Sequence, residues 1–438
     1  MVGLARSGAA AARMLARRGE VVRGVDAGNP GRAEGLGALG VEVTVDTDGL
    51  AQLEGTHTVV KSPGVPREAP VIAAAYERRI EVVGELELAW RALPNRFLAV
   101  TGTNGKTTTV ELLGHIYRSA GEPVAVAGNV GTALSELVGE VDPEATIVCE
   151  CSSFQLEDTS YFAPECAVFL NLAPDHLDRH GDFGAYGAAK LKIFANQGND
   201  DLAIYNADEE ELAGIDLGGC ARRIAFGHGD GPDRELSLSE GTIFHHGEAL
   251  IAVEELALPG EHNVANAMAA AAAALAMGIG RDAVREGLRS FAGVPHRLEP
   301  VAEIDGVRFV NDSKATNVAS AAVGLGAFPR GVHAILGGSE KGEPFAPLVA
   351  PIVQRCSACY LIGETAARMA MELEPVTVAD VPLIHCSDLE DAVRRAFAAA
   401  ATESEGVILL SPACASFDEF ENFERRGERF REIVADLR

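Results

Sequence analysis

The feature that most constrains this chain is the stretch AVTGTNGKTTTVELL at residues 99–113. It follows a short apolar run and leads into apolar residues at helical spacing, which predicts a strand, a tight loop and a helix. Gly102 and Gly105 let the backbone approach an anion closely, and the first amide groups of the helix point toward it. In this pattern Lys106 supplies a charge to the outer phosphates and Thr107 a hydroxyl to magnesium. The stretch therefore predicts a loop that holds the phosphates of a nucleotide.

The glycine spacing of this loop matches a shorter variant of the usual phosphate loop, Gly-Thr-Asn-Gly-Lys-Thr. The usual phosphate loop has a glycine five positions before its final glycine, and Val100 stands there. A glycine-containing turn capped by threonine is the alternative. We favour nucleotide binding, because Gly-Lys-Thr between a strand and a helix seldom arises without a phosphate ligand.

The composition limits the function classes. The chain of 438 residues is long enough for about three domains, and its 47% of hydrophobic residues can bury substantial cores. Its 64 acidic side chains against 37 basic ones give a net charge of −27, which would repel a polyanion. No apolar run approaches the roughly 20 residues of a membrane span, and the first residues do not resemble a secretion signal. We therefore expect a cytoplasmic protein that binds no nucleic acid and inserts into no membrane.

Alternating strand and helix patterns predict an α/β chain of three domains. Residues 1–93 indicate a Rossmann-like domain, 94–296 a central mononucleotide-binding domain with the phosphate loop, and 297–438 a smaller parallel-sheet, Rossmann-like domain. Only two residues precede Gly3, where a first strand should turn into a helix, so we expect that strand to be missing. The strands are expected at residues 20–25, 57–60, 97–100, 146–149, 167–171, 202–205, 307–310, 333–336, 360–362 and 407–410.

Acidic and imidazole groups follow the predicted central strands, at the edge where open α/β sheets place ligands. Glu150 and His176 are candidate magnesium ligands beside Thr107, since magnesium takes oxygen ligands and the occasional imidazole. Each alone could be an acid at a strand end or a capping histidine, but their grouping favours a site. Lys190, in AYGAAKLKIF, would by itself be a solvated or ion-paired lysine.

Further polar residues stand at predicted turns, where a ligand role and ordinary turn chemistry are both open. Ser7 and Asp26 lie where a dinucleotide fold binds its ligand, and Asn263 begins a helix. The third domain adds two polar loops directly after strands, with these candidates for a second substrate: Asp312, Lys314, Thr316, Ser416 and Phe423.

Together these stretches resemble the Mur ligase family. The matching motifs follow the family order over nearly the whole chain: TGTNGKTT, GNVG, ECSSFQLE, DHLDRHG, AAKLKIF, GEHNVANAMAA, PHRLE, NDSKATN and LLSPACASFDEFENFERRG. The resemblance implies ATP-dependent amide formation in peptidoglycan precursor synthesis, through an acyl phosphate and with release of ADP and phosphate. It implies UDP-N-acetylmuramoyl-L-alanine and D-glutamate as substrates, held by the first and third domains, MgATP in the central domain, and a monomeric chain.

The resemblance also implies roles for individual residues. Lys106, His176 and Lys190 would be catalytic, with Lys190 carbamylated. Two magnesium ions would be held by Thr107, Glu150, His176 and Lys190. ATP would be bound by Gly102, Thr103, Asn104, Gly105, Lys106, Thr107, Thr108, Asn263, Arg297, Asp312 and Lys314. The nucleotide-sugar substrate would contact Arg6, Ser7, Asp26, Ser62, Pro63, Gly64, Asn129 and Ser152. The amino acid would contact Thr316, Lys341, Ser416, Phe417 and Phe423.

Two alternatives remain open. Other Mur ligases and folylpolyglutamate synthetase share the central domain, but diaminopimelate-adding members usually carry an Asp-Asn-Pro-Arg motif, which this sequence lacks, and SPACASFDEF favours glutamate. The second alternative is a nucleotide-dependent binding or regulatory protein that has lost turnover. Such a protein would be expected to lose Lys106, Glu150, His176 or Lys190, and all four are present.

Overall fold

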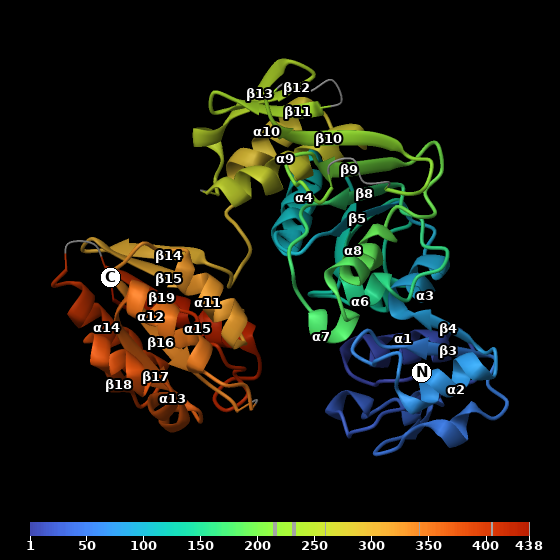
Figure 1. The fold of residues 1–438 in the computed structure, drawn as a ribbon, viewed down its shortest axis with the longest axis horizontal. Helices are drawn as coiled ribbons and strands as arrows, with labels where there is room; N and C mark the ends of the chain where they lie inside the picture. Colours follow the sequence, from blue (N-terminus) through green and yellow to red (C-terminus); the bar gives the residue numbers. More distant parts are fainter. Residues whose placement is uncertain (213–216, 230–233, 259, 341, 404–405, 438) are drawn as a thin grey trace. The chain divides into compact units, whose positions relative to one another are not determined.

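The computed structural model describes residues 1–212, 217–229, 234–258, 260–340, 342–403 and 406–437 (Figure 1). The chain divides into two compact units, Met1–Phe291 and Ala292–Arg438. Strands and helices alternate through both, so the predicted α/β class is confirmed. Within the part described, none of the helices has both the length and the apolar character needed to cross a membrane.

The first unit begins with two parallel strand pairs, β1 with β2 and β3 with β4. Val2 forms single parallel bridges to Val25 and to Lys61, so it stands between the two pairs. One bridging residue therefore occupies the place of the strand that the sequence analysis expects to be missing. The bounds are β1 Arg23–Val25, β2 Glu42–Thr44, β3 Thr58–Lys61, β4 Glu81–Gly84, α1 Arg6–Arg17, α2 Pro70–Glu77 and α3 Glu85–Ala92.

The rest of the first unit is built on a nine-stranded sheet of order β13-β12-β11-β10-β9-β8-β5-β7-β6. The strands are β5 Phe97–Thr101, β6 Val124–Gly128, β7 Thr146–Glu150, β8 Cys166–Phe169, β9 Leu202–Asn206, β10 Arg222–His228, β11 Arg234–Ser239, β12 Thr242–His245 and β13 Glu248–Ala252. The helices are α4 Lys106–Ala120, α5 Leu134–Leu137, α6 Ser153–Leu156, α7 Leu177–His180, α8 Phe183–Leu191, α9 Glu261–Ala276 and α10 Arg281–Ser290.

Strand β5 lies in the interior of this sheet, parallel to β7 on one side and to β8 on the other. All five of its residues are buried. Phe97 and Ala99 pack in one cluster with residues of α3 and α8. Because successive strand residues face opposite sides, the residues between them face the layer that contains α4 and α9 (Figure 1). A strand covered on both faces explains the uninterrupted apolar run before the phosphate loop.

The second unit contains a six-stranded sheet of order β14-β15-β19-β16-β17-β18. The strands are β14 Glu299–Ile304, β15 Val307–Asn311, β16 Val332–Gly337, β17 Cys356–Ile362, β18 Leu383–His385 and β19 Val407–Leu410. The helices are α11 Val318–Gly326, α12 Val349–Arg355, α13 Ala366–Glu372, α14 Leu389–Ala400 and α15 Phe423–Ala435. Strand β14 runs antiparallel to β15, so the expectation of a purely parallel sheet is wrong at this edge.

The structure contains three antiparallel hairpins, β11–β12, β12–β13 and β14–β15, of which only β15 was a predicted strand. Each is joined by a residue pair ending in glycine with both φ angles positive: Glu240-Gly241, His246-Gly247 and Asp305-Gly306. Two positive φ angles match the turn type that the twist of a hairpin favours. The glycine pairs were the available signal, and the strands escaped notice because they are short and only partly buried.

Candidate active site

The turn between β5 and α4 has the form that the sequence predicts for a phosphate loop. Gly102 has a φ of 150° and Gly105 a φ of 81°, which side chains disfavour. A Cβ atom on Gly102 would lie 3.0 Å from the Leu170 Cβ atom, and one on Gly105 would lie 2.2 Å from Asn266 Oδ1. The loop therefore requires glycine at both positions. Helix α4 begins directly after it at Lys106, so the amide groups of its first turn face the loop.

The loop is anchored to the segment that follows β8. The Thr103 amide donates to the Asn171 carbonyl at 3.0 Å, and the Asn104 amide donates to Asn171 Oδ1 at 2.8 Å. Thr103 Oγ1 also lies 3.2 Å from the Tyr186 hydroxyl. Thr108 is half-buried in the first turn of α4. The sequence analysis missed the role of Asn171, whose only signal is its place as the last residue of a predicted strand.

Two lysine side chains converge on one carbonyl of the loop. Lys106 Nζ donates to the carbonyls of Gly102 and Thr103, both at 2.9 Å. Lys190 Nζ donates to the same Gly102 carbonyl at 2.7 Å and lies 4.7 Å from the centre of the Tyr186 ring. The Lys190 side chain is 1% exposed, and its burial together with the nearby Lys106 charge lowers its pKa to about 7. The structure therefore brings together two predicted residues that lie far apart in the sequence.

Polar side chains from three segments meet at the end of β7. Glu150 Oε2 accepts a hydrogen bond from Thr107 Oγ1 at 2.8 Å, and Oε1 accepts one from Asn129 Nδ2 at 2.9 Å. The Glu150 side chain is buried. A Cβ atom on Gly128 would lie 2.3 Å from the backbone carbonyl oxygen of Glu150. This close approach brings the GNVG segment against Glu150. The Glu150 carboxylate and Thr107 hydroxyl oxygens are ligand types that suit magnesium.

His176 lies at the N-terminus of α7 in the left-handed conformation, with a φ of 51°. Its Nε2 atom is 3.4 Å from Asp175 Oδ2, and its ring centre is 4.8 Å from that of Phe154. The Tyr186 ring lies 6.4 Å from the His176 ring and also contacts Lys190. His176 and Lys190 therefore flank one aromatic side chain. Phe154 was missed by the sequence analysis, because an aromatic residue in a short helix carries no specific signal.

Two other predicted residues occupy structural positions beside the site. Ser152 caps α6. Its hydroxyl accepts a hydrogen bond from the backbone amide of Gln155, and its own backbone amide donates to Gln155 Oε1. Asn263 lies in the first turn of α9, and its Oδ1 atom is 3.4 Å from Asn266 Nδ2. Asn266 in turn accepts from Thr109 Oγ1 at 3.4 Å and packs against the phosphate loop. Helix α9 thus begins next to the loop, as an adenine or phosphate contact would require.

The predicted nucleotide-sugar residues gather at the carboxyl ends of the first strands. Ser7 Oγ lies 3.2 Å from Ser62 Oγ, which follows β3. Asp26 follows β1 and accepts from the amide groups of Leu4 at 2.6 Å and Gly28 at 2.9 Å. The Asp26 carboxylate therefore organises the loop before α1 with the strand beside it.

Two more contacts complete this corner of the first unit. Pro63 and Gly64 form the turn after β3. Arg6 begins α1 and donates from Nη2 to the Asn129 carbonyl at 2.7 Å. Arg6 thus joins the first strands to the segment that contacts Glu150.

In the second unit, the loop after β15 holds several of the predicted residues. Asp312 Oδ2 accepts from Ser411 Oγ at 2.7 Å, and its side chain is buried. Burial raises the pKa of Asp312 to about 6, although Ser411 and the charge of Arg297 act in the opposite direction. The Lys314 amide donates to the His296 carbonyl at 2.9 Å. Arg297, Asp312 and Lys314 therefore lie close together in this unit.

The loop after β19 meets the loop after β15 through a buried arginine that the sequence analysis missed. Arg426, on α15, is 1% exposed. It donates to Ser313 Oγ and the Ser313 carbonyl, both at 3.0 Å, and to the carbonyls of Cys414 and Ala415, both at 3.1 Å. The charged motif ending in ERRG contains it, but no pattern distinguishes a buried arginine from its exposed neighbour.

The predicted amino-acid residues differ in exposure. Ser416 is buried, whereas the Phe417 side chain is 74% exposed. Phe423 begins α15, and its carbonyl accepts from Ser313 Oγ at 2.8 Å. The Thr316 amide donates to the backbone two residues earlier. Lys341 lies outside the described residues.

The chain matches known proteins over its whole length. Residues 100–274 match the Mur ligase middle domain, and residues 296–414 match the domain described as "Mur ligase, glutamate ligase domain". A UDP-N-acetylmuramoylalanine-D-glutamate ligase of Pelotomaculum thermopropionicum is 41% identical over 446 residues, covering 100% of this chain and 97% of that protein. The protein of the same name from Anaeromyxobacter dehalogenans is 44% identical, with the same coverage of 100% and 97%.

A solved structure shares the fold. The UDP-N-acetylmuramate-alanine ligase of Thermotoga maritima superposes with a TM-score of 0.58 at 19% identity, covering 100% of this chain and 99% of the other. At this identity the likeness concerns the fold alone.

Proposed function

Since the chain belongs to the Mur ligase family, we propose that it joins D-glutamate to UDP-N-acetylmuramoyl-L-alanine with consumption of ATP. The observation that carries the proposal is the convergence of Lys106, Lys190, Thr107 and Glu150 around the Gly102–Gly105 turn. The choice of substrates is supported by the names of relatives that match over the full chain.

The reaction has two bond-forming steps. The carboxylate of the nucleotide-sugar substrate attacks the γ-phosphorus of ATP, and the bond to the bridging oxygen of ADP breaks. The amine of D-glutamate then attacks the acyl carbon, phosphate leaves and the amine loses a proton. The loop amides and Lys106 hold the phosphates in position and offset the charge that develops on them. No nucleophile from the protein is required.

The donor set at the end of β7 fits a magnesium ion. Thr107 and Glu150 would hold one ion, and His176 with Lys190 would hold a second. Bound magnesium supplies positive charge to the phosphate oxygens. Asn129 orients the Glu150 carboxylate through its 2.9 Å hydrogen bond.

Lys190 meets the chemical requirement for carbamylation. Its pKa of about 7 leaves a large uncharged fraction at neutral pH, and an uncharged amine attacks carbon dioxide. A nitrogen–carbon bond forms, one proton goes to solvent, and the uncharged amine becomes an anion with two oxygens. The remaining N–H can still donate to the Gly102 carbonyl, which lies 2.7 Å away in the unmodified chain. The carbamate is therefore a ligand that suits magnesium.

The remaining roles follow the predicted residues. Arg6, Ser7, Asp26 and residues 62–64 would bind the uridine diphosphate end. Thr316, Ser416, Phe417 and Phe423 would contact the amino acid. A cytoplasmic, monomeric protein is part of the same proposal, and the oligomeric state can be measured by light scattering.

Phosphate release tests the function. Purified protein with ATP, magnesium and UDP-N-acetylmuramoyl-L-alanine is given D-glutamate, L-glutamate, L-lysine or diaminopimelate in turn. We expect release with D-glutamate alone, matched by the amide product. Release with another acceptor would assign a different member of the family, and folded protein that is inactive with every acceptor would support the binding-protein alternative.

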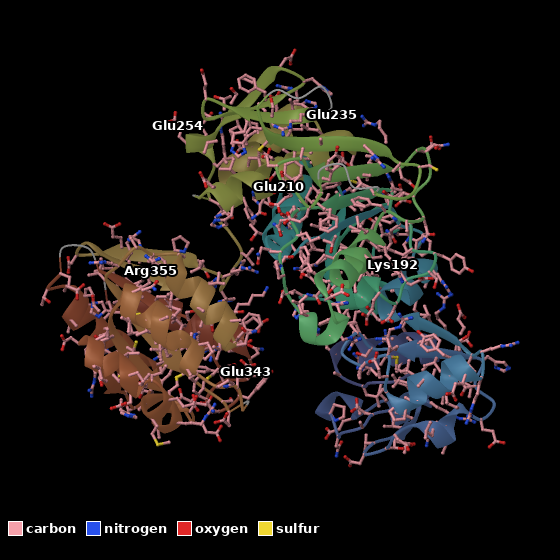
Figure 2. The ribbon with its side chains drawn as sticks, viewed as in Figure 1. Lys192, Glu210, Glu235, Glu254, Glu343 and Arg355 are labelled. Carbon is pink, nitrogen blue, oxygen red and sulfur yellow. The ribbon has the colours of Figure 1, made fainter. Side chains whose placement is uncertain are left out.

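Labelled bicarbonate tests the modification. We expect a carbamate carbon signal in the wild-type protein that Lys190→Ala abolishes. The matched control is Lys192→Ala, since Lys192 follows α8 directly and its burial also lowers its pKa (Figure 2). A signal that persists in Lys190→Ala would place the carbamate on another residue.

A further inference from the structure

The carbonyl oxygen of Val65 accepts hydrogen bonds from two cationic side chains. Lys61 Nζ donates to it at 2.8 Å, and Arg179 Nη2 donates to it at 3.1 Å. Val65 directly follows the turn at residues 62–64, and Arg179 belongs to α7 of the nine-stranded-sheet region. One carbonyl therefore joins the loop after β3 to the helix that begins beside His176.

Two carboxylates hold these cations in place. Lys61 is fully buried, and its Nζ atom lies 2.6 Å from Asp158 Oδ2. Arg179 forms a short contact with Glu157, whose Oε1 atom is also 3.8 Å from Lys61 Nζ. Buried charges are stable only when paired in good geometry, so displacing one member of this arrangement displaces the others. We call Lys61, Val65, Glu157, Asp158 and Arg179 the Val65 junction.

The Val65 junction reaches His176 through an aromatic side chain. The guanidinium carbon of Arg179 lies 5.2 Å from the centre of the Phe154 ring, within the range of a cation–π contact. The Phe154 ring also contacts the His176 ring, with 4.8 Å between the two ring centres. Arg179 and His176 are also three residues apart along the chain. The position of the imidazole is thus linked both covalently and through Phe154 to the loop after β3.

We propose that Arg179 is a positioning residue that couples the loop at residues 62–64 to His176. The inference rests on the proposed function, which assigns this loop to the nucleotide-sugar substrate and His176 to a magnesium ion. Substrate that orders the loop fixes the Val65 carbonyl, and Arg179 then holds Phe154 and the imidazole in the ligating position. Because coupling is reciprocal, the nucleotide-sugar raises the affinity for magnesium, and magnesium raises the affinity for the nucleotide-sugar.

The test is Arg179→Met in the full chain. We expect the dissociation constants of UDP-N-acetylmuramoyl-L-alanine and of magnesium, each measured by calorimetry in the presence of the other, to rise about tenfold, because coupling of this kind carries roughly one factor of ten. The KM for D-glutamate should stay at the wild-type value. Arg179→Lys keeps a donor for Val65 and should recover part of both constants.

Arg17→Met is the matched control. Arg17 of α1 pairs with Glu140 at 3.4 Å, so it also joins the first strands to the larger sheet region, but it is exposed and touches neither Val65 nor Phe154. We expect both constants to remain at their wild-type values in this variant. An equal effect of Arg17→Met would show that any contact between the two regions matters and would overturn the specific role of Arg179.

The possible outcomes distinguish a failure of the proposed role of Arg179 from a failure of the proposed ligase function. Wild-type protein that turns over, with Arg179→Met lowering only the melting temperature or kcat, overturns the inference and leaves the function intact. Inactive wild-type protein overturns the function and the inference together. If Arg179→Met does not fold, Phe154→Leu provides the second test: the magnesium constant should rise, and an unchanged constant would also overturn the inference.

Discussion

Lys190 in the first unit and Arg426 in the second are both buried cations that bond to backbone carbonyls, but their surroundings differ. Each side chain is 1% exposed. Among the described residues, Lys190 has one hydrogen-bond acceptor, the Gly102 carbonyl, for its three donors. Arg426 has acceptors on Ser313, Cys414 and Ala415 for its donors. The first cation is under-satisfied and lies beside another lysine, whereas the second is enclosed by acceptors.

This difference changes their charge at neutral pH. Burial and the Lys106 charge lower the pKa of Lys190 to about 7, while burial lowers the pKa of Arg426 only to about 10. A guanidinium with several acceptors remains charged and ties two loops together. An amine with one acceptor loses much of its charge and becomes reactive. The Lys106 charge and the single acceptor therefore distinguish the surroundings of Lys190 from those of Arg426.

Lys190→Met should produce the largest effect. In carbon dioxide-free buffer the folded protein keeps this amine at a pKa of about 7, against an ordinary lysine pKa of 10.5, so the charged form destabilises the fold. The cost is complete below pH 7, decreases as pH rises, and vanishes above pH 10.5. The variant should therefore gain up to about 5 kcal/mol in free energy of unfolding at pH 7 and little at pH 10. Urea unfolding at both pH values measures this, and a gain independent of pH would contradict it.

Lys106→Ala should lower kcat about 1,000-fold, or about 4 kcal/mol in the barrier, because Lys106 offsets charge that develops during phosphoryl transfer. The variant should also raise the pKa of Lys190, since the Lys106 charge helps to lower it. Steady-state kinetics and carbon resonance titration of the carbamate measure the two effects. Near-normal turnover would refute the role of Lys106 and weaken the comparison, because its charge would then be structural.

Arg426→Met should give the smallest of the three effects and act on stability. The variant leaves the carbonyls of Ser313, Cys414 and Ala415 without their donor, which costs about 3 kcal/mol. Scanning calorimetry should show a lower melting temperature for the second unit and an unchanged transition for the first. Arg426→Lys should recover part of the loss. Equal melting temperatures for wild type and variant would show that Arg426 does not stabilise the second unit.

The predictable part of the fold consists of strands buried on both faces. The runs predicted at residues 146–149, 202–205 and 407–410 correspond to β7, β9 and β19 to within one residue. Such strands are apolar throughout, so they stand out in the sequence. The strands β11 to β14 were missed because one face is exposed and their pattern is weak, although Asp305-Gly306 and similar pairs mark their turns.

The sequence predicted the motif residues of the candidate site, but it did not predict which other side chains contact them. Motifs identify Lys106, Glu150, His176 and Lys190, and the order of strands explains why they share one edge of the sheet. The partners Asn171, Phe154, Arg179 and Arg426 carry ordinary side chains in ordinary patterns. Their roles arise only from neighbours that are distant in the chain.

The sequence by itself determined the α/β class, the phosphate loop and the family, because these depend on local patterns: apolar runs, glycine spacing and motif order. The tertiary structure decided the charge of the buried side chains and their hydrogen-bond partners. Gly102 and Lys190 are 88 positions apart, yet one hydrogen bond of 2.7 Å joins them. Burial and neighbouring charge set the pKa of that lysine, and both depend on packing between segments that no local pattern describes.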